Sequence, residues 1–229
     1  MESASEIKIQ DMQKPTVIII DYGIGNLHSV LRACEKVGIQ VKISNNKQEI
    51  LAADALVLPG VGAFGDAMIN LKSYDLVQPI LDFAQTGKYI MGVCLGMQLL
   101  MTESEEFSKN KGLDLIQGSC LRFPNSNEIH AQIKVPQIMW NKIYHPKGEF
   151  DQDSPLKNTK DGEFMYFVHS YYVNPENDQS VLSTTNYQGL EYASSVRKDN
   201  VFGFQFHPEK SGEKGLEIYH TFKNLILSK

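Results

Sequence analysis

Residues 89 to 102 read YIMGVCLGMQLLMT, and this stretch decides the fold class. The apolar run Tyr89 to Val93 is typical of a buried parallel strand, and Met97 to Thr102 favours a helix. Between them lies G-x-C-x-G, residues 92 to 96, in the strand, turn and helix order of a nucleophile elbow. The glycines permit a tight turn that holds the Cys94 side chain clear of the sheet, at the helix start, where free N–H groups favour the thiolate. Cys94 is therefore the candidate nucleophile, and a buried structural cysteine is the alternative.

The chain before this stretch alternates strand-like and helix-like patterns. Strand-like apolar runs occur at Thr16 to Ile20, Val41 to Ser44 and Ala55 to Leu58. The spacing of apolar residues predicts helices over Leu27 to Val37, Lys47 to Ala52 and Asp66 to Gln85. A series of strands separated by helices predicts a parallel sheet with right-handed crossovers.

The chain after this stretch contains shorter β-type runs separated by polar loops. These runs are Ser119 to Phe123, Phe164 to Val168, Val181 to Thr184 and Val201 to Phe206. The longest polar loop spans about Tyr144 to Asp161, and a final helix is expected from about Lys214 to Leu227. We therefore expect an α/β fold with an open, mostly parallel sheet, helices on both faces, and an extension of antiparallel strands. Residues 1 to 14 are expected to form an N-terminal tail, and residues 15 to 229 a single domain.

The composition of the 229 residues is that of a globular protein, with 42% hydrophobic and 21% charged residues, which excludes disordered, collagen-like and coiled-coil chains. The net charge of −5 argues against binding to nucleic acid or to an anionic membrane. The N-terminal residues lack the apolar run of a signal peptide, so we expect a cytoplasmic protein. The three cysteines form no CxxC pair, so neither a disulfide framework nor a cysteine metal site is expected.

A thiolate nucleophile needs a base, and His207 is the candidate among the six histidines. It ends a β-type run and precedes Glu209 by two residues, so the two side chains share a face if the backbone is extended. Pro208 restrains the backbone between them, and the carboxylate can orient the imidazole and stabilise its charged form. The histidines without such a partner are expected at the surface or the core edge: His28, His130, His145 and His220. Cys34 and Cys120 are expected in the core.

A glycine-rich turn, Pro59 to Gly62, follows the strand-like run that ends at Leu58. Ligands bind at the carboxyl ends of strands in open α/β sheets, and such a turn can direct a backbone N–H toward an oxyanion. A plain tight turn is the alternative. Two nucleotide-binding patterns fail, because His28 occupies the third glycine position of G-x-G-x-x-G and Asp66 stands where a phosphate-binding loop requires lysine. We therefore expect neither a cofactor nor a metal.

Several longer motifs, in order along the chain from about Thr16 to Leu227, carry a family resemblance. They are residues 21 to 27 (DYGIGNL), 59 to 66 (PGVGAFGD), 92 to 100 (GVCLGMQLL), 134 to 136 (KVP), 166 to 171 (YFVHSY) and 203 to 211 (GFQFHPEKS). The sequence resembles the class I (triad) glutamine amidotransferases and, among them, the family of glutaminase subunits of imidazole glycerol phosphate synthases.

The resemblance implies a role for each matching residue. The implied catalytic residues are Cys94 as nucleophile, His207 as base and Glu209 as the group that orients it. The implied oxyanion donors are the backbone N–H groups of Val61 and Leu95. The implied glutamine-binding residues are Gln98, Glu106, His169, Ser170 and Tyr171. The positions and chemistry of two of these residues suit glutamine binding. Gln98 lies one helical turn after Cys94, and Glu106 can pair with the α-ammonium group of glutamine.

The resemblance also implies a partner. Hydrolysis of glutamine through a thioester gives glutamate and ammonia, and free ammonia would disperse in bulk water. In the family, a (β/α)₈ barrel synthase in a heterodimer receives the ammonia and makes imidazole glycerol phosphate in histidine biosynthesis. Asn26, Trp140 and Lys210 match the family positions that face this synthase.

One stretch departs from the family pattern. The family reads Lys-Val-Pro-His, one further residue and then Gly-Trp-Asn, whereas this chain has Gln137 and Met139 at the His and Gly positions. The first alternative is therefore a related glutaminase that supplies another synthase, such as a sugar-amidating enzyme of surface-polysaccharide assembly. Two further alternatives are a cysteine hydrolase or peptidase without a partner, and a catalytically silent binding subunit, which would require a broken triad.

Overall fold

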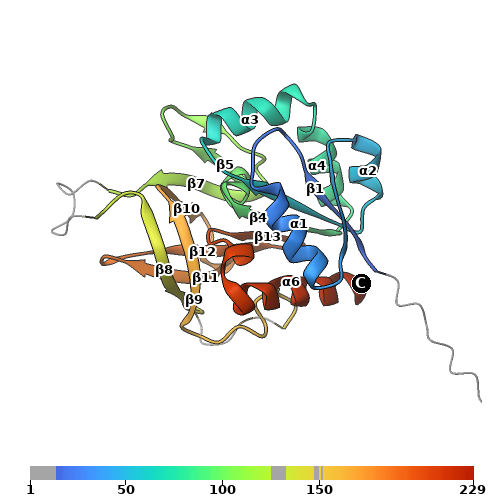
Figure 1. The fold of residues 1–229 in the computed structure, drawn as a ribbon. Coiled ribbons are helices and arrows are strands. Elements are labelled where there is room, and N and C mark those ends of the chain that lie inside the picture. The colour runs from blue at the N-terminus through green and yellow to red at the C-terminus, as the bar shows by residue number, and fades with distance from the viewer. Residues whose placement is uncertain (1–13, 125–132, 147–149, 151) are drawn as a thin grey trace, which may run out of the picture.

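The computed structural model describes residues 14–124, 133–146, 150 and 152–229. The expected N-terminal tail lies outside these residues except for Lys14, and so does His130. Within the described residues, one large sheet has helices on both faces, and two further strands form a small second sheet (Figure 1).

Five parallel strands of the described residues form one end of the large sheet, in the order β2-β1-β3-β4-β13. They are β2 (Gln40–Ser44), β1 (Thr16–Ile20), β3 (Ala55–Gly60), β4 (Tyr89–Cys94) and β13 (Val201–Phe204). Their apolar runs suit strands that are covered on both faces. Gly60 at the end of β3 is paired with Cys94 at the end of β4, which brings the two glycine-rich turns together.

The same sheet continues from β13 into mostly antiparallel strands, in the order β12-β10-β7-β5-β6, with β11 paired to β12. They are β5 (Met101–Ser104), β6 (Asn110–Lys111), β7 (Ile116–Arg122), β10 (Tyr171–Pro175), β11 (Val181–Tyr187) and β12 (Leu190–Lys198). Pairing is parallel between β5 and β7. This mixed sheet confirms the expected fold class.

The second sheet is the antiparallel pair β8 (Gln137–Ile143) and β9 (Glu163–His169). Gln137 lies opposite His169, and Trp140 lies opposite Tyr166. Directly after β8, Tyr144 forms an isolated antiparallel bridge with Thr184 of β11, so the small sheet is tied to the large one.

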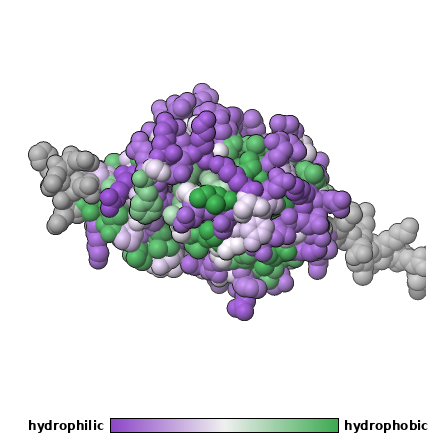
Figure 2. Space-filling view, turned by 90° about the horizontal axis from the view of Figure 1, so that it is seen from above, coloured by the Kyte–Doolittle hydropathy of each residue, from purple (hydrophilic) through white to green (hydrophobic). Residues whose placement is uncertain are grey.

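Alternating side chains of β1 show how the layers form. Val17 and Ile19 join one apolar cluster with α1 and α6, and Ile18 and Ile20 join a second cluster with α2, α3 and α4. The helices are α1 (Leu27–Lys36), α2 (Lys47–Ala52), α3 (Phe64–Ser73), α4 (Val77–Gln85) and α6 (Gly212–Leu227). Figure 1 shows α3 and α4 on one side of the sheet and α1 and α6 on the other. The face in Figure 2 is mainly hydrophilic, with several smaller hydrophobic areas, one of them near its centre.

The single helix expected over Asp66 to Gln85 is wrong, because the structure has two helices there, α3 and α4. Asp75 adopts φ +55°, and the N–H of Leu76 donates to the carbonyl of Leu71, which ends α3. The apolar periodicity continues through this break and therefore does not reveal it.

The helix expected over Met97 to Thr102 is also displaced. The structure has a short helix, α5 (Leu95–Leu99), and Met101 already begins β5. Strand β5 pairs with β6 and β7, and these pairings override the helical preference of the local sequence.

The remaining expected strands and helices are confirmed with ends shifted by a few residues. Every strand-like run lies mainly in a strand, and α6 begins at Gly212 rather than Lys214. The sequence analysis did not predict β5, β6, β8, β10 and β12. Cys34 and Cys120 are buried, as expected. None of the helices in the described part of the chain has the length and apolar character needed to cross a membrane.

Candidate active site

The elbow at Cys94 is built by the close approach of two backbone segments. Cys94 ends β4 with φ +55° and ψ −112°, and α5 begins at the next residue. A Cβ on Gly96 would lie 1.7 Å from the carbonyl oxygen of Leu58, and one on Gly92 would lie 2.8 Å from the carbonyl oxygen of Gly96. Both positions therefore require glycine. The positive φ at Cys94 is a strained conformation, costing about 1–3 kcal/mol, that this packing maintains.

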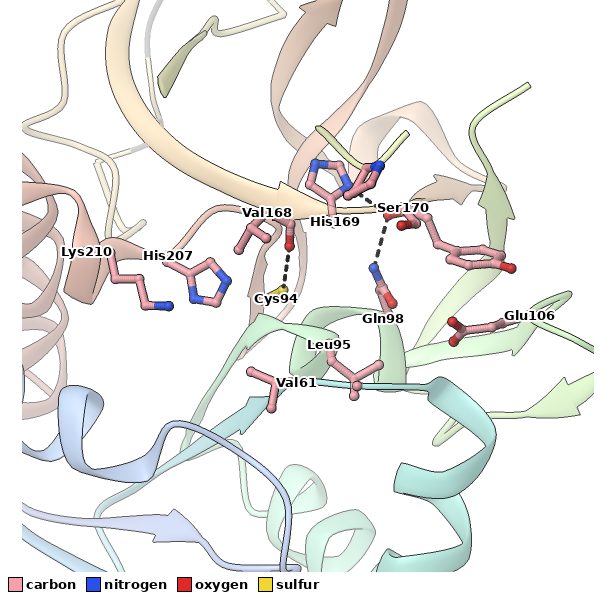
Figure 3. A pocket seen from close by; sticks show the side chains of 13 residues that line it. Val61, Cys94, Leu95, Gln98, Glu106, Val168, His169, Ser170, His207 and Lys210 are labelled. Atoms are coloured by element: carbon pink, nitrogen blue, oxygen red, sulfur yellow. Dashed lines mark hydrogen bonds between the residues drawn. The ribbon is translucent and has the colours of Figure 1, made fainter. Parts of the chain in front are cut away.

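The Cys94 side chain lies at the centre of the site. The residue is 7% exposed, its Sγ lies 3.8 Å from the carbonyl oxygen of Val168, and Gln205 Nε2 lies 3.8 Å from the same sulfur. Figure 3 shows Cys94 between His207 on one side and Gln98 on the other. The Cys94 thiol can thus react with a substrate in the pocket, and the His207 ring lies beside it to accept its proton.

His207 and Glu209 form a buried pair. Nδ1 of His207 lies 2.8 Å from Oε1 of Glu209, and the two side chains are 3% and 1% exposed. Burial acts to lower the pKa of His207, but the interactions with Cys94 and Glu209 outweigh it and raise that pKa to about 10. Among the described residues, Nε2 of His207 has no hydrogen-bond partner and is left for the thiol or a substrate.

The expected extended backbone between these residues is wrong in detail. Strand β13 ends at Phe204, and Glu209 lies in a 3₁₀ turn, Pro208–Lys210, that follows His207. Ser211 Oγ donates to the carbonyl of His207 at 2.7 Å, which holds this turn closed. The turn, rather than a strand face, brings the carboxylate to the imidazole.

A cavity of about 330 Å³ opens above Cys94. All the residues expected around the oxyanion and the glutamine line it together with Cys94 and His207: Val61, Leu95, Gln98, Glu106, His169, Ser170 and Tyr171. Leu95 opens α5, where N–H groups lack helical partners, and Val61 directly follows the end of β3. The lining also includes Gly62, Pro136, Val168 and Lys210, of which only Lys210 had been singled out for a role.

Gln98 and Glu106 lie along the side of the pocket away from His207 (Figure 3). Gln98 is 5% exposed, and its Nε2 donates to the carbonyl of Tyr171 and to Oε1 of Gln205, each at 3.1 Å. Glu106 accepts the backbone N–H of Phe64 at 2.6 Å. Burial is the main cause that raises the pKa of the Glu106 carboxyl.

His169 is held in the pocket wall by both ring nitrogens. Nδ1 lies 2.8 Å from the carbonyl oxygen of Tyr171, and Nε2 lies 3.2 Å from the hydroxyl of Tyr192. Burial lowers the pKa of His169 to about 4, so the ring is neutral near pH 7. His207 and His169 thus carry different charges within one site.

The three expected interface residues occupy different places. Lys210 is exposed at the pocket, and Asn26 precedes α1 beside a small cavity that Val61 and Glu209 also line. Trp140 is 47% exposed on β8, away from the pocket lining, with its ring 6.0 Å from that of Tyr166.

Two residues that contact the pocket residues from behind were also given no role in the sequence analysis. Gln205 contacts both Cys94 and Gln98, and its signal was its place two residues before His207. Tyr192 contacts His169 from β12, a strand that was not expected, and no local pattern marks it.

A cysteine elbow, a buried His–Glu pair and an α/β sheet of this order define the class of protein. The chain belongs to the class-I glutamine amidotransferase family, whose model matches residues 18–224. The fold agrees, since the structure of PurLQS from Thermotoga maritima superposes with a TM-score of 0.68 at 21% identity, covering 93% of this chain and 99% of that one.

Two sequence relatives carry the name of one particular enzyme subunit within this class. The chain is 52% identical over 209 residues to imidazole glycerol phosphate synthase subunit HisH of Methanosarcina mazei, covering 90% of this chain and 96% of the relative. It is 44% identical over 210 residues to the subunit of the same name from Moorella thermoacetica, covering 92% and 95% of the two chains.

Proposed function

We propose that this protein is the glutaminase subunit of an imidazole glycerol phosphate synthase. It hydrolyses glutamine to glutamate and ammonia, and the ammonia passes to a synthase subunit that uses it in histidine biosynthesis. The observation that carries the glutaminase chemistry is the placement of Cys94 between His207 and Gln98 in one pocket. The similarity to HisH subunits over about nine-tenths of the chain supports the choice of synthase.

In the proposed reaction, the Cys94 thiolate attacks the side-chain amide carbon of glutamine. The carbonyl oxygen gains negative charge and is stabilised by the backbone N–H groups of Val61 and Leu95. The C–N bond breaks as His207, charged and held by Glu209, donates its proton to the leaving ammonia. Water then attacks the γ-glutamyl thioester, His207 accepts the water proton, and glutamate leaves with the sulfur restored.

The pocket also orients the substrate in this proposal. The α-ammonium group of glutamine pairs with the Glu106 carboxylate, which is the acidic group at the end of the pocket away from His207. Gln98, His169, Ser170 and Tyr171 complete the binding residues. Neutral His169 adds no positive charge that would repel the α-ammonium group.

We further propose that the partner is a (β/α)₈ barrel synthase in a heterodimer, contacted by Asn26, Trp140 and Lys210. The exposed indole of Trp140 supports this, because exposed aromatic residues often anchor protein interfaces. Cytoplasmic location, the absence of nucleic-acid and membrane partners, and one domain over residues 15 to 229 stay predictions. The family match across residues 18–224 supports the single domain.

The test mixes the chain with the barrel synthase of the histidine pathway and its ribonucleotide substrate, and measures glutamate release from glutamine. We expect release to rise about tenfold or more over the isolated chain, through coupling between the two sites. Cys94→Ala should abolish release, whereas Cys34→Ala, which removes a different buried thiol, should retain it.

Two outcomes would redirect the assignment. Labelling of Cys94 by a glutamine-mimicking electrophile without activation by this synthase would favour another ammonia acceptor, such as a sugar-amidating enzyme. Absence of labelling in the folded complex, with turnover of other amide or peptide substrates, would favour a cysteine hydrolase instead.

A further inference from the structure

Gln137 is a buried polar residue next to the pocket. It begins β8 opposite His169, and it is 0% exposed. Inward-facing neighbours in the same small sheet, such as Phe167 and Met165, are apolar and equally buried. A buried amide among such residues is costly unless its hydrogen bonds are made, so its position calls for a reason.

A continuous line of contacts leads from Gln137 to the glutamine pocket. The Gln137 amide lies 2.9 Å from the Tyr192 hydroxyl, which lies 3.2 Å from Nε2 of His169. Nδ1 of His169 lies 2.8 Å from the carbonyl oxygen of Tyr171 (Figure 3). That carbonyl also accepts Nε2 of Gln98 at 3.1 Å. This line of contacts therefore reaches His169 and Gln98, whose side chains form part of the pocket wall.

Counting the available protons shows which group donates in each hydrogen bond along this line of contacts. A carbonyl oxygen only accepts, so Nδ1 of His169 carries the proton that is shared with Tyr171. In the neutral ring Nε2 is then an acceptor, and the Tyr192 hydroxyl must donate to it. Tyr192 has a single hydroxyl proton, so it cannot also donate to Gln137.

The Gln137 amide must therefore donate to Tyr192. The oxygen and nitrogen of an amide have nearly the same shape, and their assignment follows from the hydrogen-bond network. With Oε1 facing Tyr192, the Gln137 Nε2 is buried without a partner among the described residues. Exchanging the two atoms gives Nε2 an acceptor and lets Tyr192 donate to His169.

We propose that Gln137 is a positioning residue for the glutaminase site, whose amide N–H sets the direction of the hydrogen bonds through Tyr192 and His169. The inference rests on the proposed function of the pocket. The Gln137 amide N–H keeps His169 as the Nδ1–H tautomer, which is bonded to the Tyr171 carbonyl that also accepts from Gln98.

The charge of His169 matters because of its surroundings. The groups packed around it are the rings of Phe123 and Phe167, the Tyr192 hydroxyl from β12 and, through its charge, His207. A second positive charge here would disfavour the charged His207 that protonates ammonia. A neutral, oriented His169 is thus the state that suits the proposed reaction.

Gln137→Glu tests the direction. Burial raises the pKa of a carboxyl at this position, and the neutral acid can donate to Tyr192 as the amide does. Once it is ionised at higher pH, the carboxylate only accepts, so Tyr192 must donate to it and can no longer donate to His169, whose Nε2 must then carry a proton. In ¹⁵N-histidine NMR of the full chain at pH 7, we expect one protonated and one bare ring nitrogen for His169 in the parent. In Gln137→Glu we expect Nε2 to become protonated as the pH is raised from 7 to 9 and the buried carboxyl ionises, whereas the parent should not change. The His169→Gln variant identifies the signals.

Tyr192→Phe gives a second readout if Gln137→Glu does not fold. It removes the donor to Nε2, so the Nε2 signal should shift while Nδ1 stays protonated. In both variants the KM for glutamine should rise about tenfold with a smaller change in kcat, as expected for loss of a buried hydrogen bond. Thr185→Val, which removes a buried hydroxyl that has no partner among the described residues, is the matched control and should change neither.

A parent His169 that carries its proton on Nε2 would overturn the proposed direction. Unchanged ring signals in both Gln137→Glu and Tyr192→Phe would overturn the coupling. The NMR result does not depend on turnover, so a failure of the proposed glutaminase function would appear separately, as a chain with the expected tautomer and no glutamate release.

Discussion

The backbone of Gly96 packs so tightly against Leu58 that a Cβ on this glycine would lie 1.7 Å from the Leu58 carbonyl oxygen. Gly96 belongs to α5 and Leu58 to β3, so the contact joins the helix after the nucleophile to the neighbouring strand. We expect Gly96→Ala to lower the free energy of unfolding by about 3 kcal/mol, because the backbone must shift. Urea unfolding followed by circular dichroism measures the change.

Gly65→Ala is the control for this effect. Gly65 lies in α3, and the nearest atoms to its added Cβ would be those of the Asn110 side chain, at 3.4 Å, which is an ordinary contact distance. Alanine is also the better helix former, so the change should stay within about 1 kcal/mol. Equal destabilisation by both substitutions would show that the contact with Leu58 is not the cause.

Glu209→Gln should uncouple the His207 imidazole from its stabilising charge. The carboxylate contributes to the high pKa of His207, so its removal should move that pKa down from about 10. We expect kcat for glutamate release to fall about a hundredfold, because His207 then loses its orientation and its charged form. Histidine NMR titration and steady-state kinetics measure both effects.

The exposed Glu213 at the start of α6 provides the comparison for Glu209. Glu213→Gln removes the same charge but makes no contact with His207, so both the His207 titration and kcat should stay as in the parent. A His207 pKa that does not move in Glu209→Gln would contradict the assigned pair.

Glu106→Gln should weaken glutamine binding. In the proposed function its carboxylate pairs with the α-ammonium group, so its loss should raise the KM for glutamine about tenfold and change kcat less. The adjacent Glu105 is exposed and is not among the residues that line the pocket, which makes Glu105→Gln the control. An equal KM in the parent and Glu106→Gln would remove Glu106 from the binding site.

His169 should make the protein less stable in acid. Its pKa is about 4 in the folded chain and about 6.5 when unfolded, so between these values the unfolded chain binds more protons. Stability therefore rises with pH across this window and falls on acidification, by about 3 kcal/mol for this one group.

Unfolding of the parent and of His169→Gln at pH 7 and at pH 4.5 separates this contribution from those of other groups. The stability gap between the two proteins should change with pH in the direction that favours His169→Gln in acid. Parallel curves would mean that His169 is not buried in the neutral form.

Trp140→Ala should weaken binding to the barrel synthase. A half-exposed indole that becomes buried in an interface typically contributes about 2 kcal/mol, so the Kd should rise about thirtyfold. Tyr74 is similarly exposed, on the surface at the end of α3, and Tyr74→Ala should leave the Kd unchanged. Calorimetric titration of the two subunits would show whether the loss is specific to Trp140.

The parallel part of the fold could be predicted because its signals are local. Strands such as β1 and β4 are buried on both faces and read as continuous apolar runs. Strand β12 could not be found in this way, since Ser194 and Ser195 are polar in sequence yet fully buried. Their burial depends on hydroxyl bonds to Ser183 of β11, a partner chosen by the sheet.

The amino-acid sequence alone was enough to single out Cys94, His207 and Glu209 as candidates, because a glycine-flanked cysteine after a strand-like run and the His-Pro-Glu motif are short local patterns of residue types. Long-range packing was needed for everything that depends on burial and on distant partners. The neutral state of His169, the contact of Gln205 with Cys94 and the alignment of Gln137 with Tyr192 all join segments far apart in the chain. Such contacts exist only once the sheet has formed and water has been excluded, since desolvation and hydrogen-bond partners then set charge and orientation.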